Sequence, residues 1–387
     1  MEHLKNKRIC FFVPETVPSS AGGGRNAFYF ARYLSARCAG ATICCLNYNK
    51  KLKAEEFSNG VRIHRAAYFN KTILHKAISF PWLLIKYLQF IALNHIIILY
   101  GNYMPAWQII IVFGRLLRRK VVFRSTLLGD DDIFAIKEKS GFFWPLTRLI
   151  LRQANLYFAI NQAFESKWKA VFGNRVPMLV TVQGIDNAMY NKGLRDMQPV
   201  RKTRKLVFLS CGMLIERKGY RHIFNALSRL DIDFKYIVAG QYIPDKWHNG
   251  TKGERAEMDE LYNKGIELLG NKIEFAGHTE NIDQYYKLAD IFIHGAFSEG
   301  TPNSVLEAMA AGMPVLVREL AGLSGVFVQG FNVEVYKTES ELTERINYLA
   351  NNPAYCLQLA HNAAATIEKN YTFGNIAAQI SEKLYGG

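Results

Sequence analysis

Short apolar runs of strand length alternate with helix-length segments along almost the whole chain, and this alternation limits the possible folds more than any other feature. In the first half the strand-length runs lie at 8–13, 41–46, 61–66, 96–100, 120–125, 156–160 and 178–182. In the second half they lie at 206–210, 234–239, 272–275, 291–294 and 315–317. Strands that alternate with helices form parallel sheets covered by helices. The sequence therefore predicts an α/β protein.

A change of composition divides the chain in two. Residues 187–204 hold few apolar side chains and many charges, so we place a linker there. We expect residues 1–186 to form one domain and residues 205–371 a second. A chain of 387 residues is long enough for two such cores. In doubly wound sheets of this kind, ligands bind at the carboxyl ends of the strands.

The amino-terminal residues and the cysteines indicate a cytoplasmic protein. Residues 1–8 are polar and lack the apolar stretch of a signal peptide. Polar residues interrupt the apolar region 78–117, so no window reaches the roughly 20 residues that a membrane span needs. The six cysteines lie mostly in apolar runs, which is typical of buried thiols in a reducing compartment. We expect at most an attachment to the inner face of the membrane.

The net charge of +15 belongs to the first half of the chain. Residues 1–200 carry 28 Lys and Arg against 11 Asp and Glu, whereas the remainder carries 20 against 22. Solubility alone could explain this excess. Contact with an anionic membrane or a phosphorylated lipid could explain it equally, and the uneven placement favours such a surface. No nucleic-acid recognition motif accompanies the charge, so we expect no nucleic-acid partner.

The most informative stretch, residues 298–309, follows an apolar strand and opens a helix. Glu299 lies in the loop before that predicted helix, and Glu307 lies about one turn inside it. Two ionised carboxylates at this spacing can accept hydrogen bonds from two sets of hydroxyls. Backbone N–H groups at a helix start can also bind hydroxyls or phosphates. The residues that would present them are Gly300, Thr301, Pro302, Asn303 and Ser304. On spacing alone, it is equally good to interpret Glu299 as a solvent-exposed loop acid and Glu307 as a charge on the helix surface, without a binding role.

Two other turns carry residues suited to a diphosphate. Arg217 and Lys218 lie between a predicted strand and a predicted helix, where a fixed cation can stabilise negative charge on a leaving group. Gly23 and Gly24 lie between the first strand and the first helix, where glycine lets the backbone approach a phosphate closely. Glycine-rich turns are common, so the second signal is weak by itself.

The run from Ala289 through Glu299 and Glu307 to Val315 resembles the donor-site signature of the retaining glycosyltransferases of family 4. The resemblance covers nearly the whole second half of the chain. It implies a GT-B fold, which has two Rossmann-like domains with a cleft between them. It also implies that the carboxy-terminal domain binds a nucleotide-sugar donor, that the amino-terminal domain binds the acceptor, and that a final helix, 372–387, packs back onto the first domain.

The same resemblance assigns roles to the donor-side residues. It implies that Glu299 contacts the transferred sugar and that Glu307 contacts the donor ribose. Lys218 matches the lysine that holds the donor diphosphate. Met213 stands where the family has an arginine, so Arg217 is the candidate second cation. Gly23 and Gly24 would lie beside the diphosphate, and the backbone around His278 and Thr279 would frame the nucleobase.

The acceptor side departs from the family pattern. Thr126 stands near the position where many relatives carry a histidine, and Asp130 follows in the same loop. Residues 130–132 also form a D-x-D sequence, which binds a divalent metal in the other large glycosyltransferase fold. A metal needs oxygen ligands that converge from several places, and one loop does not supply them. We therefore expect an acceptor-binding or structural role for this loop, and no metal cofactor.

The resemblance thus predicts a metal-independent, retaining hexosyltransferase. It would use a nucleotide-diphosphate sugar and a lipid-linked or envelope glycan as acceptor. Other functions stay open: a nucleotide-sugar epimerase or phosphorolytic enzyme of the same fold, a nucleic-acid binder, or a catalytically impaired partner subunit. Met213 and the missing histidine favour the impaired subunit, whereas Glu299, Glu307 and Lys218 favour an active enzyme.

The Lys218→Ala substitution tests the role of the predicted diphosphate lysine. We expect turnover to fall by roughly 10²–10³-fold, because one strong stabiliser of the transition state is lost. The measurement is sugar transfer or donor hydrolysis by the purified variant, with circular dichroism to verify its folding. A change of less than a few-fold in a folded variant would remove Lys218 from the diphosphate site.

Overall fold

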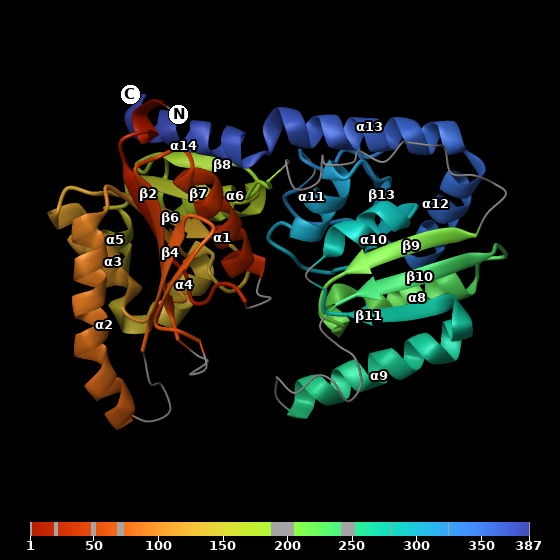
Figure 1. Cartoon of the computed structure of the whole chain (residues 1–387), viewed down its shortest axis with the longest axis horizontal. Helices are drawn as coiled ribbons and strands as arrows, with labels where there is room; N and C mark the ends of the chain where they lie inside the picture. Colours follow the sequence, from red (N-terminus) through yellow and green to blue (C-terminus); the bar gives the residue numbers. More distant parts are fainter. Residues whose placement is uncertain are drawn as a thin grey trace. The chain divides into compact units, whose positions relative to one another are not determined.

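The computed structural model describes residues 2–18, 22–47, 52–67, 73–186, 205–240, 252–279, 281–323 and 325–386. The chain divides into two compact units (Figure 1). Unit 1 comprises Met1–Asp186 together with Phe373–Gly387, and unit 2 comprises Asn187–Thr372. The predicted linker, residues 187–204, lies outside the described residues.

Unit 1 is built around an eight-stranded sheet with the order β3-β4-β2-β1-β5-β6-β7-β8. Its strands are β1 (Arg8–Phe12), β2 (Gly40–Leu46), β3 (Glu55–Ser58), β4 (Val61–Ala66), β5 (Ile96–Tyr100), β6 (Lys120–Ser125), β7 (Leu156–Ala159) and β8 (Met178–Val180). Neighbouring strands are parallel except for the edge pair β3 and β4. The central strand β5, with the sequence IIILY, is buried along its whole length, as expected of a parallel strand covered on both faces.

Helices cover both faces of this sheet. On one face α2, α3 and α5 lie side by side, and on the other α1 packs against α14 (Figure 1). The helices of unit 1 are α1 (Gly22–Ser35), α2 (Ile73–Leu93), α3 (Trp107–Leu116), α4 (Ile133–Ser140), α5 (Trp144–Leu151), α6 (Gln162–Phe172) and α14 (Phe373–Tyr385), with 3-10 turns η1 (Glu2–Leu4) and η2 (Gly141–Phe143). Within the described ranges, no helix is both long enough and apolar enough to cross a membrane.

Unit 2 is built around a six-stranded parallel sheet with the order β11-β10-β9-β12-β13-β14. Its strands are β9 (Leu206–Cys211), β10 (Phe234–Ala239), β11 (Ile273–Gly277), β12 (Ile291–His294), β13 (Val315–Arg318) and β14 (Glu334–Tyr336). Its helices are η3 (Glu216–Lys218), α8 (Tyr220–Ser228), α9 (Lys252–Leu269), η4 (Gly270–Lys272), α10 (Ile282–Leu288), α11 (Asn303–Ala310), α12 (Glu339–Asn351) and α13 (Pro353–Asn370).

Every strand that the apolar runs predict is present in the structure. Two further strands, β3 and β14, are not predicted. The sequence of β3, Glu55–Ser58, contains a single apolar residue, and β14 is only three residues long. Both are edge strands. An edge strand has only one neighbour and needs less apolar surface, so its sequence pattern is weak.

Substitution of Phe373 tests how strongly the last helix stabilises unit 1. Phe373 begins α14, is 2% exposed, and stacks on Phe30 of α1 with a ring-centroid distance of 5.1 Å. We expect Phe373→Ala to lower the free energy of unfolding of unit 1 by about 3–5 kcal/mol, because it leaves a cavity in the core. Urea denaturation followed by circular dichroism measures the change.

The matched control is Phe331→Ala, since Phe331 is 50% exposed in unit 2. We expect a change within about 0.5 kcal/mol for this exposed position. Equal, small shifts for both variants would show that α14 does not stabilise the first unit.

Candidate functional site

The strand order of unit 2 reverses its direction between β9 and β12. From β9 the chain proceeds to β10 and β11 on one side of the sheet, and then returns to β12 on the other side. At such a reversal the loops after the two central strands diverge and leave a crevice at the carboxyl edge, which is where open α/β sheets bind ligands. Lys218 follows β9 and Glu299 follows β12, so the topology brings their two loops to this edge.

Two glycines let these loops approach each other closely. Gly219 has a φ of +71°, a left-handed conformation that side chains other than glycine rarely adopt. A Cβ atom at Gly219 would lie 2.0 Å from the carbonyl oxygen of Gly295, in the loop after β12. Phe297 in that loop also donates its backbone N–H to the carbonyl of Arg217 at 3.0 Å. Lys218 is therefore held directly against the loop that carries Glu299.

Two cations converge on the Glu299 carboxylate. The Nζ atom of Lys218 forms an ion pair with Oε1 of Glu299. The Nη1 atom of Arg217 lies 3.4 Å from the same oxygen and donates a hydrogen bond to the carbonyl of Ser298 at 2.8 Å. Met213 packs instead against the hydrophobic core of unit 2. Arg217, and not a side chain at position 213, thus contributes the second cation of this cluster.

The pKa values of two residues in the cluster are displaced. Burial acts to raise the pKa of Glu299, but the charge and hydrogen bond of Lys218 and the charge of Arg217 outweigh it and hold the pKa below its usual value. Burial lowers the pKa of His294 to about 3, and the charge of Lys218 acts in the same direction. Around neutral pH, Glu299 is therefore an anion and His294 is uncharged.

The sequence interpretation did not single out His294. It is the last residue of β12, is 4% exposed, and neither of its ring nitrogens has a hydrogen-bond partner among the described residues. A buried imidazole without partners is costly. The signal in the sequence was a single polar residue at the end of the apolar strand IFIH, and it was overlooked.

Glu307 lies on α11, the helix that follows Glu299. It is half-buried, and its Oε2 accepts a hydrogen bond from the hydroxyl of Tyr286 on α10 at 3.0 Å. Tyr286 is also absent from the sequence prediction, although it fixes this carboxylate. Of the small residues between the two glutamates, Thr301 is buried, Pro302 directly precedes α11, and Asn303 is its first residue. The donor-side roles of these residues stay a prediction.

The other donor-side candidates lie on separate elements. In unit 1, a Cβ atom at Gly24 would lie 2.1 Å from the carbonyl oxygen of Glu15, so packing against the chain already requires glycine there. For Gly23, the described residues place no atom within 4 Å of such a Cβ. In unit 2, His278 is exposed directly after β11, and the hydroxyl of Thr279 accepts a hydrogen bond from the backbone of Asn281.

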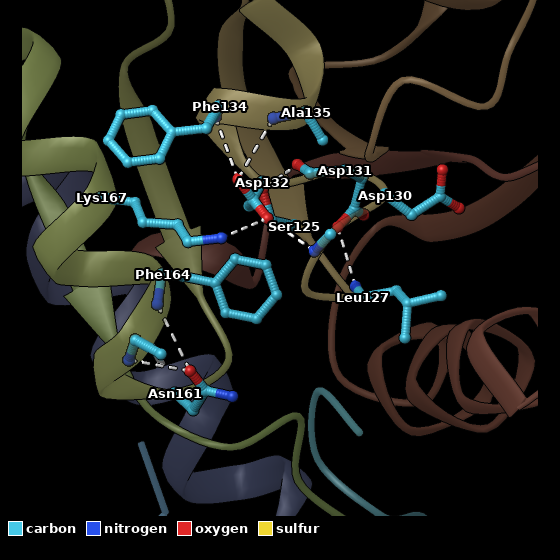
Figure 2. Close-up of polar contacts among 12 residues, drawn as sticks. Ser125, Leu127, Asp130, Asp131, Asp132, Phe134, Ala135, Asn161, Phe164 and Lys167 are labelled. Atoms are coloured by element: carbon cyan, nitrogen blue, oxygen red, sulfur yellow. Dashed lines mark hydrogen bonds and ion pairs between the residues drawn. The ribbon is translucent and has the colours of Figure 1, made fainter. Parts of the chain in front are cut away.

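The aspartates of the D-x-D sequence are engaged within their own unit (Figure 2). Asp132 caps α4, since its Oδ1 accepts hydrogen bonds from the N–H groups of Phe134 and Ala135, and its Oδ2 forms an ion pair with Lys167 at 2.7 Å. Asp130 forms an ion pair with Lys139. The described residues contain no group of three or more His, Cys, Asp or Glu side chains that could hold a metal ion.

Asp131 closes the loop that contains Thr126. Its carboxylate accepts hydrogen bonds from the backbone N–H and the hydroxyl of Thr126 at 2.6 and 2.8 Å, and from the N–H of Leu127 at 2.7 Å. Burial raises the pKa of Asp131 to about 7, although these three donors act against the rise. The structural role of this loop is thus clear, whereas the acceptor-side role of Thr126 and Asp130 stays a prediction.

Unit 1 contains a cavity of about 450 Å³ between α3, α4 and α5. Its wall combines apolar and polar side chains. Trp107, Phe143 and Leu146 contribute apolar surface, while Gln108 and Lys139 contribute polar groups. No local pattern in the sequence predicts this cavity, because its lining residues come from elements that are separate in the sequence.

Comparison with known proteins shows that unit 2 is similar to a known family. Residues 195–366 match the family model described as Glycosyl transferases group 1. The matched residues lie within unit 2 and make up less than half of the chain. The matched range includes both cations and both glutamates of the site, as well as His294.

Two relatives are similar over part of the chain. The N,N'-diacetylbacillosaminyl-diphospho-undecaprenol alpha-1,3-N-acetylgalactosaminyltransferase of Campylobacter jejuni subsp. jejuni serotype O:2 is 31% identical over 184 residues, which cover 47% of this chain and 45% of that protein. The putative teichuronic acid biosynthesis glycosyltransferase TuaC of Bacillus subtilis is 21% identical over 261 residues, 66% of this chain and 62% of that protein. The chain spans about half the length of the curated relatives it matches.

A solved structure is similar over the full length. The Anabaena protein Alr3699/HepE, crystallised with UDP and glucose, superposes with a TM-score of 0.73 at 19% sequence identity, and the match covers 99% of this chain and 100% of that one. The chain therefore has the GT-B fold, with two Rossmann-like domains, and this prediction is confirmed.

The buried histidine predicts how the stability of unit 2 depends on pH. The folded chain keeps His294 neutral down to about pH 3, whereas the unfolded chain takes up a proton below about pH 6.5. Unfolding therefore takes up a proton in this range, and the free energy of unfolding falls as the pH falls from 6.5 towards 3. Compared with His294→Leu, the wild-type free energy of unfolding should fall more steeply in this window, by up to about 1.4 kcal/mol per pH unit.

Urea denaturation of both proteins between pH 7 and pH 4 measures this difference. Parallel curves for the wild type and His294→Leu would show that His294 does not titrate on unfolding in this range.

Proposed function

We propose that this protein is a retaining glycosyltransferase that moves a hexose-type sugar from a nucleotide-diphosphate donor to a lipid-linked or envelope glycan. The observation that carries the proposal is the convergence of Lys218 and Arg217 on Glu299 at the carboxyl edge of the unit 2 sheet. Two cations and a carboxylate at one point can bind, respectively, the phosphates and the hydroxyls of a sugar nucleotide.

The cations would act on the leaving group. As the bond between the sugar C1 and the phosphate oxygen breaks, negative charge grows on the diphosphate. Lys218 and Arg217 are already oriented in the cluster, so they can stabilise this charge with little rearrangement. Because the two cations neutralise the diphosphate, we propose that the reaction needs no metal ion.

Glu299 would have two roles: it would pair with Lys218 before the donor binds, and it would then bind the sugar. In the absence of a donor its carboxylate neutralises Lys218, which is half-buried and would otherwise lie unpaired. A diphosphate competes for the lysine, and the carboxylate can then accept hydrogen bonds from the hydroxyls of the transferred sugar. Glu307, which Tyr286 fixes from α10, is suited to accept hydrogen bonds from the ribose.

The proposed reaction retains the anomeric configuration. The acceptor hydroxyl attacks C1 from the face that the phosphate leaves, through an oxocarbenium-like state. The bond from C1 to the acceptor oxygen forms as the bond to the phosphate oxygen breaks, and the acceptor proton passes to that phosphate oxygen. No side chain has to act as a strong base, so threonine at position 126 is compatible with activity.

The nature of the acceptor is proposed from the relatives. The name of the Campylobacter protein specifies a diphospho-undecaprenol acceptor, and that of the Bacillus protein specifies teichuronic acid biosynthesis. The Anabaena protein was crystallised with UDP and glucose. We propose a similar lipid-linked or envelope glycan for this chain, reached from the cytoplasmic face of the membrane.

A thermal-shift panel of UDP, GDP, ADP, CMP and their common sugar conjugates tests this proposal. At 100 times its dissociation constant, a ligand stabilises the folded state by about 2.7 kcal/mol, which is measurable as a rise in Tm. We expect one nucleotide diphosphate to raise Tm equally with and without EDTA. The matched control is Lys218→Ala, in which the shift should be strongly reduced because a diphosphate contact is lost.

Three results would contradict parts of this proposal. No shift with any nucleotide would favour a catalytically impaired partner subunit. A shift that EDTA abolishes would contradict metal independence. An undiminished shift in Lys218→Ala would exclude the proposed diphosphate contact.

A further inference from the structure

Three helices of unit 1 present apolar side chains to solvent on the same face of the sheet. On α2 these are Trp82 and Ile85, on α3 they are Val112 and Leu116, and on η2 and α5 they are Phe142, Phe143, Leu146 and Leu149. Within each helix the spacing is three or four residues, so the side chains form a stripe along one side. Because α2 packs on α3 and α3 on α5, the three helices lie side by side (Figure 1), and the exposed stripes therefore belong to neighbouring helices. We call this surface the α2-α3-α5 face.

The exposure on this face is large. Phe142 is 93% exposed and Leu116 is 70% exposed. Scattered apolar residues are normal on a protein surface, but a contiguous group of this kind marks a surface that binds a partner or a membrane. Phe142 and Phe143 belong to the 3-10 turn that precedes α5, and neither is buried by the rest of the chain.

The charge around the face has a single sign over a long stretch. No Asp or Glu occurs between Glu56 and Asp130, a stretch that contains the whole of α2 and α3. On α2, Lys86 lies 5.2 Å from the ring of Trp82, and at the end of α3 Arg115 and Arg118 are exposed. The apolar stripes are thus accompanied by cations, and the chain segment that forms α2 and α3 offers no anion to neutralise them.

We propose that the α2-α3-α5 face docks on the surface of an anionic lipid bilayer. In this arrangement Phe142, Phe143 and Leu116 enter the boundary between headgroups and acyl chains. Arg115 and Arg118 meet the lipid phosphates. Surfaces that combine exposed apolar side chains with Lys and Arg bind the membrane interface through both the burial of apolar area and the electrostatic attraction to anionic lipids.

Charge complementarity favours a bilayer over a second copy of the chain. Two such faces would bring the cations of one copy against those of the other. A bilayer supplies apolar volume and negative charge in adjacent layers, which is the combination that this face requires.

This inference places the proposed transferase at a membrane surface. It rests on the proposed function only where it assumes that the acceptor is lipid-linked. Phe143 and Leu146 lie on the docking face and also line the cavity between α3, α4 and α5. Docking would therefore bring the cavity to the headgroup level. Vesicle binding itself needs neither donor nor acceptor, so it can be tested independently of the activity.

The test is flotation of the full chain with vesicles of phosphatidylcholine alone or mixed with phosphatidylglycerol. We expect binding to the mixed vesicles that weakens as salt is added. The double substitution Phe142→Ser with Phe143→Ser should weaken this binding roughly tenfold or more, because apolar surface no longer enters the interface. The matched control is Phe57→Ser, since Phe57 is 74% exposed in the same unit but lies on β3; its binding should equal that of the wild type.

A second pair of variants tests the cations. Substitution of both Arg115 and Arg118 by Ser should weaken binding to the anionic vesicles by about fivefold per cation. Vesicles should cause a blue shift of tryptophan fluorescence in the wild type. Most of this shift should be absent from the Trp82→Phe variant. Circular dichroism verifies that each variant is folded.

Three results would overturn the proposal. They are equal binding of phosphatidylcholine and mixed vesicles, binding that the Phe142 and Phe143 substitutions do not weaken, and a dimer in solution that these substitutions abolish. If vesicle binding behaves as expected but no nucleotide shifts Tm, the proposed transferase function fails while the docking face stands. If nucleotides bind but vesicles do not, the docking face alone fails.

Discussion

The approach of Gly219 to the carbonyl oxygen of Gly295 is the contact on which the polar site of unit 2 depends. Any Cβ atom at position 219 would overlap that oxygen, and the left-handed φ of Gly219 excludes most other residues a second time. The contact joins the loop after β9 to the loop after β12, the two loops that diverge where the strand order reverses. Lys218 and Glu299 reach one another because the backbones beneath them touch.

Once the loops are joined, the charges in this site constrain one another. A half-buried lysine needs an anion, and Glu299 supplies it in the described structure. The same cations lower the pKa of Glu299, while burial, assisted by the charge of Lys218, keeps His294 neutral. Glu299 thus neutralises one of the two cations. In the proposed function, an incoming diphosphate would replace this carboxylate as the anion, so the site could stay folded without a ligand and still present its cations to a donor.

Unit 1 uses its polar residues differently. Asp131 closes a loop and Asp132 caps a helix. Two aspartates of a sequence that formally matches a metal-binding D-x-D pattern therefore accept hydrogen bonds from backbone N–H groups. The residues of this unit that could contact a partner lie instead on its surface. Phe142 and Leu116 are exposed there, and Leu116 lies beside the exposed cations Arg115 and Arg118. In each unit, local geometry separates two groups of residues. One group forms hydrogen bonds with the backbone, and the other remains available to a partner.

Apolar periodicity is a local property of the chain, so the sequence alone predicts the α/β class and every strand except β3 and β14. Its family resemblance predicts the GT-B fold. The sequence also located the charged residues at the strand ends. Only the three-dimensional packing reveals that Arg217 reaches Glu299 while Met213 packs against the core, and that His294 has no hydrogen-bond partner in the part of the chain that the structure describes. These outcomes depend on contacts between loops some eighty residues apart, and no local pattern encodes where such side chains meet. The edge strand β3 escaped prediction for a related reason, since its pairing with β4 and not its own composition makes it a strand.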